Sequence, residues 1–387
     1  MGTTEWIIVI LVVGARLLLP LLIPYFPVPA IIACLLLDSV DQSIFQQFPA
    51  IPLDGYQSYD KALDVYYLSV TYLSTLRNWT NQTAFRMSQF LYYYRMVGVV
   101  AFELTQVRAI LFIFPNTFEY FFIFAELVRL RWNTSRMGKW TVILATAMIW
   151  VFIKLPQEWW IHIAQLDMTD FIKETMFGVS TDASWGEAIA NRPWVLLLTI
   201  AVFAAIGCIG YWIVTRKAPP GDHKPRLSAD PLPPELHGGK LYRTVRAQSR
   251  VFGWALREKI ALTAIVCVIF GTMISGGEAD PLRIAVGATI FTVINAGVSH
   301  VMARRGRTWR TVAAELVTML VVNLVIVLLI EAAERWLGLR GARSPFATTL
   351  FFSYLLTLII VLYDRYRTVY KARRIGLRKR EAAETTA

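Results

Sequence analysis

The sequence predicts an all-α integral membrane protein with about ten transmembrane helices and short interfacial helices on its outer face. Hydrophobic residues make up 56% of the 387 residues and charged residues only 17%, whereas soluble domains carry about a quarter of charged residues. Apolar runs long enough to cross a hydrocarbon core of about 30 Å recur along the chain. Because backbone groups in lipid must be paired within their own segment, these continuous runs predict helices.

Ten apolar runs are recognised, and a proline-rich stretch divides them into two groups. The predicted transmembrane helices cover residues 6–26, 62–78, 88–114, 117–131, 139–156, 194–215, 259–275, 283–302, 312–332 and 345–363. Six prolines and little apolar content predict an extended, mobile linker between the groups. The predicted organisation is an N-terminal six-helix membrane half (1–215), a Pro-rich cytoplasmic linker (216–240), a basic amphipathic interfacial helix (241–258), a C-terminal four-helix membrane half (259–363) and a basic cytoplasmic tail (364–387).

Charge is sorted between alternate connections of the predicted helices. Lys and Arg dominate one set, such as "RLRWNTSRMGK", while Asp and Glu dominate the other, such as residues 38–64. Basic connections stay in the cytoplasm, so we predict a multi-pass protein of the cell (plasma) membrane with both termini cytoplasmic. Residues 27–48 leave one alternative open. They form either a re-entrant or interfacial helix, or a further span that would place the N-terminus outside.

The basic composition points to lipid as the partner. Arg243, Arg246, Arg250 and Arg257 recur at helical spacing, which is typical of an amphipathic helix lying on anionic lipids of the inner leaflet. The alternative is a short solvated helix leading into the next span. The net charge of +12 resides mainly on segments that flank spans, so we predict no nucleic-acid binding. The sequence identifies no protein partner.

Acidic residues on the predicted outer side offer ligands for a cation. The pattern LDxxD occurs twice, and each copy would present two carboxylates on one helical face. Glutamate and histidine four residues apart stand near the second copy, and such oxygen and nitrogen ligands suit a divalent cation. The alternative is that these acids cap interfacial helices. The predicted metal ligands are Asp38, Asp41, Asp167, Asp170, Glu158 and His162.

Ionisable residues also fall within or beside the apolar runs of the N-terminal half. An unpaired charge at the bilayer centre costs at least about 2.5–3.5 kcal/mol, so partners are expected. Glu103 is expected to meet a cation from another helix, with Arg16 as one candidate. The alternative is a frame of salt bridges that only locks the helices together. The residues of the predicted substrate or ion pathway are Arg16, Asp38, Asp41, Asp64, Arg95 and Glu103.

These patterns leave three functions open. Buried charge beneath an acidic outer surface favours a transporter or channel-like protein for a cation or a lipid-linked solute. The alternatives are a membrane enzyme acting on a lipid-linked phosphate substrate at the outer leaflet, and a non-catalytic assembly partner. The sequence contains no Walker motif, GxSxG elbow, HExxH motif or dinucleotide fingerprint. No cofactor is predicted apart from the divalent cation.

Overall fold

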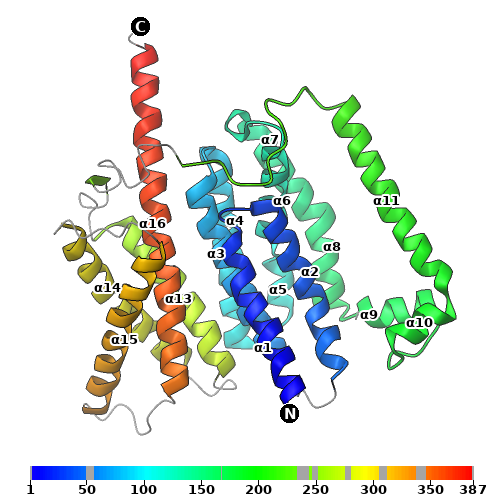
Figure 1. The fold of residues 1–387 in the computed structure, drawn as a ribbon, viewed down its shortest axis with the longest axis horizontal. Helices are drawn as coiled ribbons and strands as arrows, with labels where there is room; N and C mark the ends of the chain where they lie inside the picture. Colours follow the sequence, from blue (N-terminus) through cyan, green and yellow to red (C-terminus); the bar gives the residue numbers. More distant parts are fainter. Residues whose placement is uncertain are drawn as a thin grey trace.

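In the computed structural model, residues 2–48, 56–166, 168–232, 244–245, 252–274, 280–304, 312–336 and 346–385 are described. Every regular element within these ranges is helical, which confirms the predicted all-α class for this part of the chain. Most of the long helices run along a common direction and form one bundle, with α11 standing at its edge (Figure 1).

The helices follow one another in an up-and-down order. The N-terminal elements are α1 (Thr3–Leu18), η1 (Leu19–Leu22), α2 (Pro27–Gln46), α3 (Tyr56–Asn78), α4 (Gln82–Thr105), α5 (Ala109–Ile113), α6 (Thr117–Arg129), η2 (Thr134–Arg136) and α7 (Lys139–Met148). A mostly helical stretch with π-helical segments continues through η3 (Ile149–Lys154), α8 (Leu155–Glu158), η4 (Trp159–Ile163), α9 (Met168–Phe171), η5 (Ile172–Phe177) and α10 (Trp185–Asn191). The remaining helices are α11 (Pro193–Arg216), α13 (Trp254–Ile274), α14 (Pro281–Arg304), α15 (Val312–Trp336) and α16 (Phe346–Thr385).

Six helical segments in the described ranges are long and apolar enough to cross a membrane. They are Thr3–Leu22, Pro27–Gln46, Ala109–Arg129, Lys139–Ile163, Pro193–Ile213 and Pro281–Arg304. The predicted runs at 62–78, 88–114, 259–275, 312–332 and 345–363 fall largely on α3, α4, α13, α15 and α16, which are not among the six. The predicted count of about ten transmembrane helices is therefore not confirmed for the described residues. Most of α3 is buried by its neighbours, so its polar side chains face protein and the helix has no need to be apolar throughout.

The largest hydrophobic cluster of the described residues contains side chains from both predicted membrane halves. It contains Tyr66 and Phe118 of the N-terminal half together with Phe270 and Ile359 of the C-terminal half. The central helix α3 packs against both α13 and α16. The two sets of helices therefore fold as one packed unit.

A buried glutamate adds a polar contact between the same helices. Glu258 of α13 is only 4% exposed. It accepts hydrogen bonds from the Tyr72 hydroxyl of α3, from Gln89 Nε2 of α4 at 2.7 Å and from the Tyr363 hydroxyl of α16 at 2.7 Å. Because a buried carboxylate is tolerated only with such partners, Glu258 fixes how these four helices meet.

The helix α2 crosses the bundle in full, as in the alternative that the sequence left open for residues 27–48. It runs antiparallel to α1, and the start of α1 and the end of α16 lie at opposite ends of the bundle (Figure 1). The expectation of both termini on one side therefore does not follow from this arrangement. The apolar first half of α2 packs in the core, with Ile31 fully buried. Asp38 and Asp41 in the second half of α2 contact Arg16 of α1.

The linker is held in place over its described part, residues 217–232, which we call the strap. The backbone N–H of Ala229 donates to the Tyr25 carbonyl at 2.7 Å, and that of Asp222 donates to the Arg131 carbonyl at 2.9 Å. Arg129 Nη1 donates to the Ser228 carbonyl at 3.1 Å. The strap thus ties the turn between α1 and α2 to the end of α6. These contacts give this part of the predicted linker defined backbone partners, and its mobility stays a prediction.

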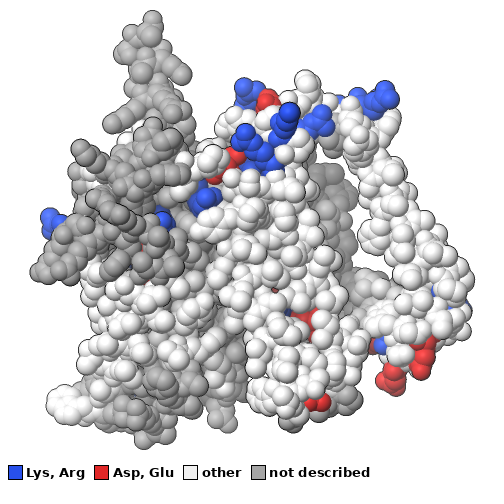
Figure 2. Space-filling view, in the orientation of Figure 1, with Lys and Arg blue, Asp and Glu red and all other residues white. Residues whose placement is uncertain are grey.

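Charged side chains separate between the two ends of the bundle. Figure 2 shows Lys and Arg gathered over the strap and the neighbouring ends of α7 and α11, and Asp and Glu around α10 at the opposite end. We call these ends the basic face and the acidic face. The separation predicted from the connecting segments is therefore visible in the fold.

Candidate acidic cation site

Four aspartates from two helices surround one arginine of a third helix. Arg16 Nη1 contacts Asp41 and lies 2.8 Å from Asp60 Oδ1. Arg16 Nη2 contacts Asp38 and lies 3.1 Å from Asp64 Oδ1. We call these five residues the acidic cluster. It joins α1, α2 and α3 toward the acidic face.

Helical spacing explains why the four carboxylates meet. Asp38 and Asp41 are three residues apart on α2, and Asp60 and Asp64 are four residues apart on α3, so each pair shares a helical face. The Tyr66 hydroxyl donates to the Leu17 carbonyl at 2.8 Å, which fixes α1 against α3 next to the arginine. The predicted pairing of carboxylates within the first LDxxD pattern agrees with their shared contact to Arg16.

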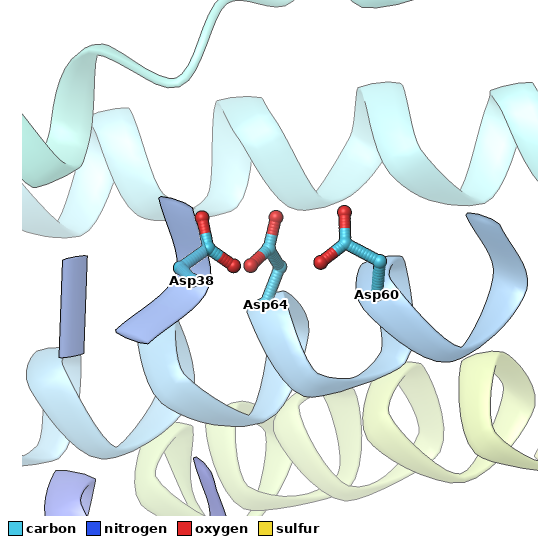
Figure 3. Close-up of side chains that lie close together, drawn as sticks. All are labelled: Asp38, Asp60 and Asp64. Carbon is cyan, nitrogen blue, oxygen red and sulfur yellow. The ribbon is translucent and has the colours of Figure 1, made fainter. Parts of the chain in front are cut away.

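Three of the carboxylates lie close enough together to bind one metal ion. Oxygen atoms of Asp38, Asp60 and Asp64 all lie within 4.8 Å of one another, and Figure 3 shows the three side chains side by side. Their side chains are 36%, 34% and 38% exposed, whereas Arg16 and Asp41 are buried. The cluster therefore has a closed side and an open side, and its oxygen ligands are those that hard divalent cations prefer.

The formal charge of the cluster is unbalanced. One guanidinium carries a single positive charge, and four ionised carboxylates carry four negative charges. The net formal charge of the cluster is therefore −3. Grouped carboxylates away from bulk water repel one another and are stable only with further cations or protons. The arrangement can therefore attract a divalent cation to its open side.

A small cavity next to the cluster leads to a chain of buried polar groups. The cavity is about the size of one water molecule and is lined by Arg16, Asp38 and Tyr67 together with Leu19, Pro20, Cys34 and Leu37. The Tyr67 hydroxyl donates to Glu119 Oε1 at 2.6 Å. Asn116 donates through Nδ2 to Glu119 Oε2 at 2.8 Å and through its backbone N–H to Glu158 Oε1 at 3.0 Å. We call Tyr67, Glu119, Asn116 and Glu158 the buried polar chain.

The predicted ligands Glu158 and His162 do not join the acidic cluster. Glu158 Oε2 lies 3.0 Å from His162 Nε2 and 3.9 Å from Arg95 Nη1, and Glu158 Oε1 lies 3.4 Å from Lys154 Nζ. The positive charges of Arg95 and Lys154 already neutralise the carboxylate and would repel a metal ion. The segments η3 and η4 that flank Glu158 are π-helical, and this irregular winding sets the spacing of Lys154 and His162 around it.

The five described residues among the six predicted metal ligands therefore do not form one site. Asp170 lies in α9, and Asp167 lies outside the described residues. Within the described ranges, Asp38, Asp60 and Asp64 are the one group of three potential ligands that is close enough for a metal. Asp41 belongs to the cluster through Arg16, whose guanidinium it contacts from the buried side.

Two further pathway residues have partners of their own. Glu103 Oε1 lies 3.9 Å from Lys61 Nζ, so the expected partner from another helix is Lys61 and the candidate Arg16 was wrong. Arg95 Nη1 donates a hydrogen bond to the Phe114 carbonyl at 2.9 Å. This bond pairs a backbone carbonyl at the C-terminal end of α5. Neither residue belongs to the acidic cluster.

The predicted lipid-facing basic helix is described only at its end. Arg257 lies in the first turn of α13 and is exposed, so its backbone continues directly into that helix. Arg243, Arg246 and Arg250 lie outside the described residues.

The structure adds two residues that sequence reasoning did not place in the site. Asp60 stands four residues before Asp64, so a search for i, i+4 carboxylate pairs would have found it. Tyr67 carries no such signal, because an aromatic residue in an apolar run is typical of a core position.

Comparison of the chain with protein-family models, with curated proteins and with solved structures gave no match. The function of the acidic cluster is therefore inferred from its own geometry and charge. The decisive features are the three clustered carboxylates, the buried Arg16–Asp41 contact behind them, and the open side of the cluster.

Replacement of Arg16 by alanine is expected to destabilise the protein by about 3–5 kcal/mol, because four carboxylates lose their shared partner. The free energy of unfolding is measured in detergent with EDTA present. The exposed Arg108→Ala variant serves as the control, with an expected loss below about 1 kcal/mol. Adding Asp41→Asn to Arg16→Ala should recover part of the loss, because it removes one uncompensated charge. Equal stability of Arg16→Ala and Arg108→Ala would contradict the central role of Arg16.

Proposed function

We propose that the chain is a multi-pass membrane protein whose acidic cluster binds a divalent cation and uses it to hold the phosphate of a lipid-linked substrate. The single observation that carries this proposal is the grouping of Asp38, Asp60 and Asp64 within 4.8 Å. Sequence alone favours transport. The geometry of the cluster favours the enzyme alternative, because the ligands surround an arginine and are open to one side.

The three carboxylates supply only part of the shell that such a cation requires. Mg²⁺ takes about six oxygen ligands and usually keeps several positions for water or substrate phosphate. Asp38, Asp60 and Asp64 would occupy the protein side of this shell. A divalent cation also reduces the formal charge of the cluster from −3 to −1. The remaining positions suit the oxygens of a phosphate.

Arg16 matches the other half of phosphate recognition. Its planar guanidinium can donate two parallel hydrogen bonds to a phosphate. In this structure its donors are engaged by the aspartates. A bound divalent cation would compete for the same carboxylates and so release some of these donors, while Asp41 retains the arginine from its buried side. The reaction class that this supports is metal-assisted transfer or hydrolysis at a phosphate group.

The depth of the cluster suits a substrate anchored in lipid. Asp64 follows the start of α3 by eight residues, which corresponds to about 12 Å along a helix. We assign the acidic face to the outside and the basic face to the cytoplasm. In this assignment α2 adds one crossing to the ten predicted from the sequence. The start of α1 then lies outside, and the end of α16 lies in the cytoplasm.

This assignment predicts opposite locations for the two ends of the chain. A small epitope tag placed before α1 is expected to react with an impermeant antibody on intact spheroplasts, whereas a tag after α16 reacts only after lysis. A tag inserted in the strap serves as a second cytoplasmic marker. Protection of both terminal tags in intact spheroplasts would contradict the added crossing by α2.

The cluster is expected to bind Mn²⁺, used as a spectroscopic substitute for Mg²⁺, at one site per chain. Asp60→Asn and Asp64→Asn should each weaken binding at least about tenfold, because each removes a charged ligand, and tenfold corresponds to about 1.4 kcal/mol. Binding is measured by electron paramagnetic resonance on the purified full chain. Asp170→Asn is the matched control and should retain the affinity of the wild-type protein. Absence of stoichiometric Mn²⁺ binding, or an equal loss of affinity in Asp170→Asn, would contradict the proposed site.

Transport of the cation is the second candidate function, and the buried polar chain favours it. The chain runs from Tyr67, at the cavity beside the cluster, through Glu119 and Asn116 to Glu158. Glu119 and Glu158 are 6% and 3% exposed. Buried carboxylates linked in this way are typical of ion or proton pathways in membrane proteins. The same residues would serve only as a structural link in the enzyme.

One pair of assays separates the two functions. For the enzyme, a water-soluble short-chain phosphatidic acid should bind the wild-type protein only when Mn²⁺ is present, and Asp60→Asn should abolish this binding. For the transporter, liposomes containing the protein should take up Mn²⁺, and Glu119→Gln should stop the uptake. Phosphate-lipid binding without uptake supports the first function. Uptake without phosphate-lipid binding transfers the assignment to the second.

A further inference from the structure

The basic face carries a surface built from two segments that are far apart in sequence. Asp222 of the strap accepts a hydrogen bond from the Asn133 backbone N–H at 2.8 Å and pairs with Arg136 at 2.9 Å. Trp132 Nε1 donates to the Pro219 carbonyl at 3.2 Å. The strap is thereby fixed on the connection between α6 and α7. We call the two connected segments, residues 130–140 and 211–226, the strap surface.

Close backbone approach supports this attachment. A Cβ atom at Gly221 would lie 2.5 Å from Cγ of Arg131, so only glycine fits here without displacing the arginine. The Asp222 backbone N–H beside it donates to the Arg131 carbonyl. The strap therefore holds a defined position on the connection, and its side chains have defined neighbours.

Positive charge dominates the strap surface. Asp222 is the one acidic residue within these two segments, and Arg136 neutralises it. Figure 2 shows the positive side chains gathered at this end of the molecule. The exposed cations that remain are Lys139, Arg216, Lys217, Lys224 and Arg226.

Exposed tryptophans place this charge at the level of lipid headgroups. Trp140 directly follows Lys139 and is 78% exposed, and Trp212 lies one helical turn before Arg216 and is 53% exposed. Both tryptophans belong to segments long and apolar enough to cross a membrane. Tryptophan is enriched where a span meets the headgroups. Lys217 Nζ lies 5.8 Å from the ring centroid of Trp212. The positive charge and the aromatic ring therefore lie together where the span meets the headgroups.

We propose that the strap surface binds the phosphate headgroups of anionic lipids in the cytoplasmic leaflet. The positive side chains complement the negative charge of a phosphate headgroup. Trp140 and Trp212 beside them favour a lipid over a soluble anion, because binding a soluble anion requires no aromatic side chains at the membrane surface. Each Lys or Arg near such a surface contributes about fivefold in affinity. This interaction is independent of the acidic cluster, which lies toward the opposite face.

The test compares lipid selectivity of the full chain in phosphatidylcholine bilayers. Spin-labelled phosphatidylglycerol and spin-labelled phosphatidylcholine report the relative association constant of the anionic lipid at the protein surface. The wild-type protein should prefer phosphatidylglycerol, and added salt should weaken the preference. Lys139→Gln combined with Lys224→Gln should lower the preference at least about fivefold. Both side chains are exposed, and an unchanged unfolding midpoint verifies that this variant is folded.

The control removes two exposed cations near the acidic face, Arg108 at the start of α5 and Arg283 in the first turn of α14. Arg108→Gln combined with Arg283→Gln should retain the wild-type preference. An equal loss in this control would overturn the proposal, because net charge alone would then explain it. Absence of any preference in the wild-type protein, or full retention in the Lys139 and Lys224 variant, would overturn it as well.

Discussion

The contact between Arg16 and four aspartates holds the N-terminal part of the molecule together. Only 17% of the apolar stretch of Thr3–Leu22 and 33% of that of Pro27–Gln46 are buried, so packing alone attaches these helices weakly to the bundle. Arg16 supplies what packing lacks, because its two terminal nitrogens reach carboxylates of both α2 and α3. In a low-dielectric surrounding, such contacts are strong, and loss of either sign of charge is costly.

The same contact leaves the cluster with excess negative charge, and from this excess the proposed function follows. Asp41 is fully buried and contacts the guanidinium, so its role is to retain Arg16. The side chains of Asp38, Asp60 and Asp64 are about one third exposed and lie close together, so they remain accessible to an incoming cation. Burial thus gives the four aspartates two roles. Asp41 retains Arg16, and the other three are potential metal ligands.

Sequence patterns predict the helical class and the separation of charge well, because both follow from composition and periodicity along the chain. They also predict that Asp38 and Asp41 act together, since i, i+3 spacing is a local property. Partner choice between helices could not be predicted. Lys61 rather than Arg16 meets Glu103, and Arg95, Lys154 and His162 surround Glu158. These pairings depend on how the helices rotate against one another.

Two other differences have the same physical origin. The run 27–48 is compatible with an interfacial helix or a span, because aspartates are costly in lipid unless a cation faces them. The sequence does not show that Arg16 of α1 contacts Asp38 and Asp41. The proline-rich strap has the composition of a mobile linker, yet its backbone groups pair with Tyr25 and Arg131 on the basic face. Such tertiary hydrogen bonds leave no periodic signal in the sequence.

The most direct measurement of the central claim is the position of a heavy divalent ion in the folded protein. Anomalous X-ray scattering from crystals grown with Mn²⁺ is predicted to show a peak at about 2.0–2.6 Å from oxygens of Asp38, Asp60 and Asp64. Arg16 is predicted to have left at least one of these carboxylates while keeping its contact with Asp41. Crystals with full Mn²⁺ occupancy elsewhere, and with all four Arg16 contacts unchanged, would contradict the claim.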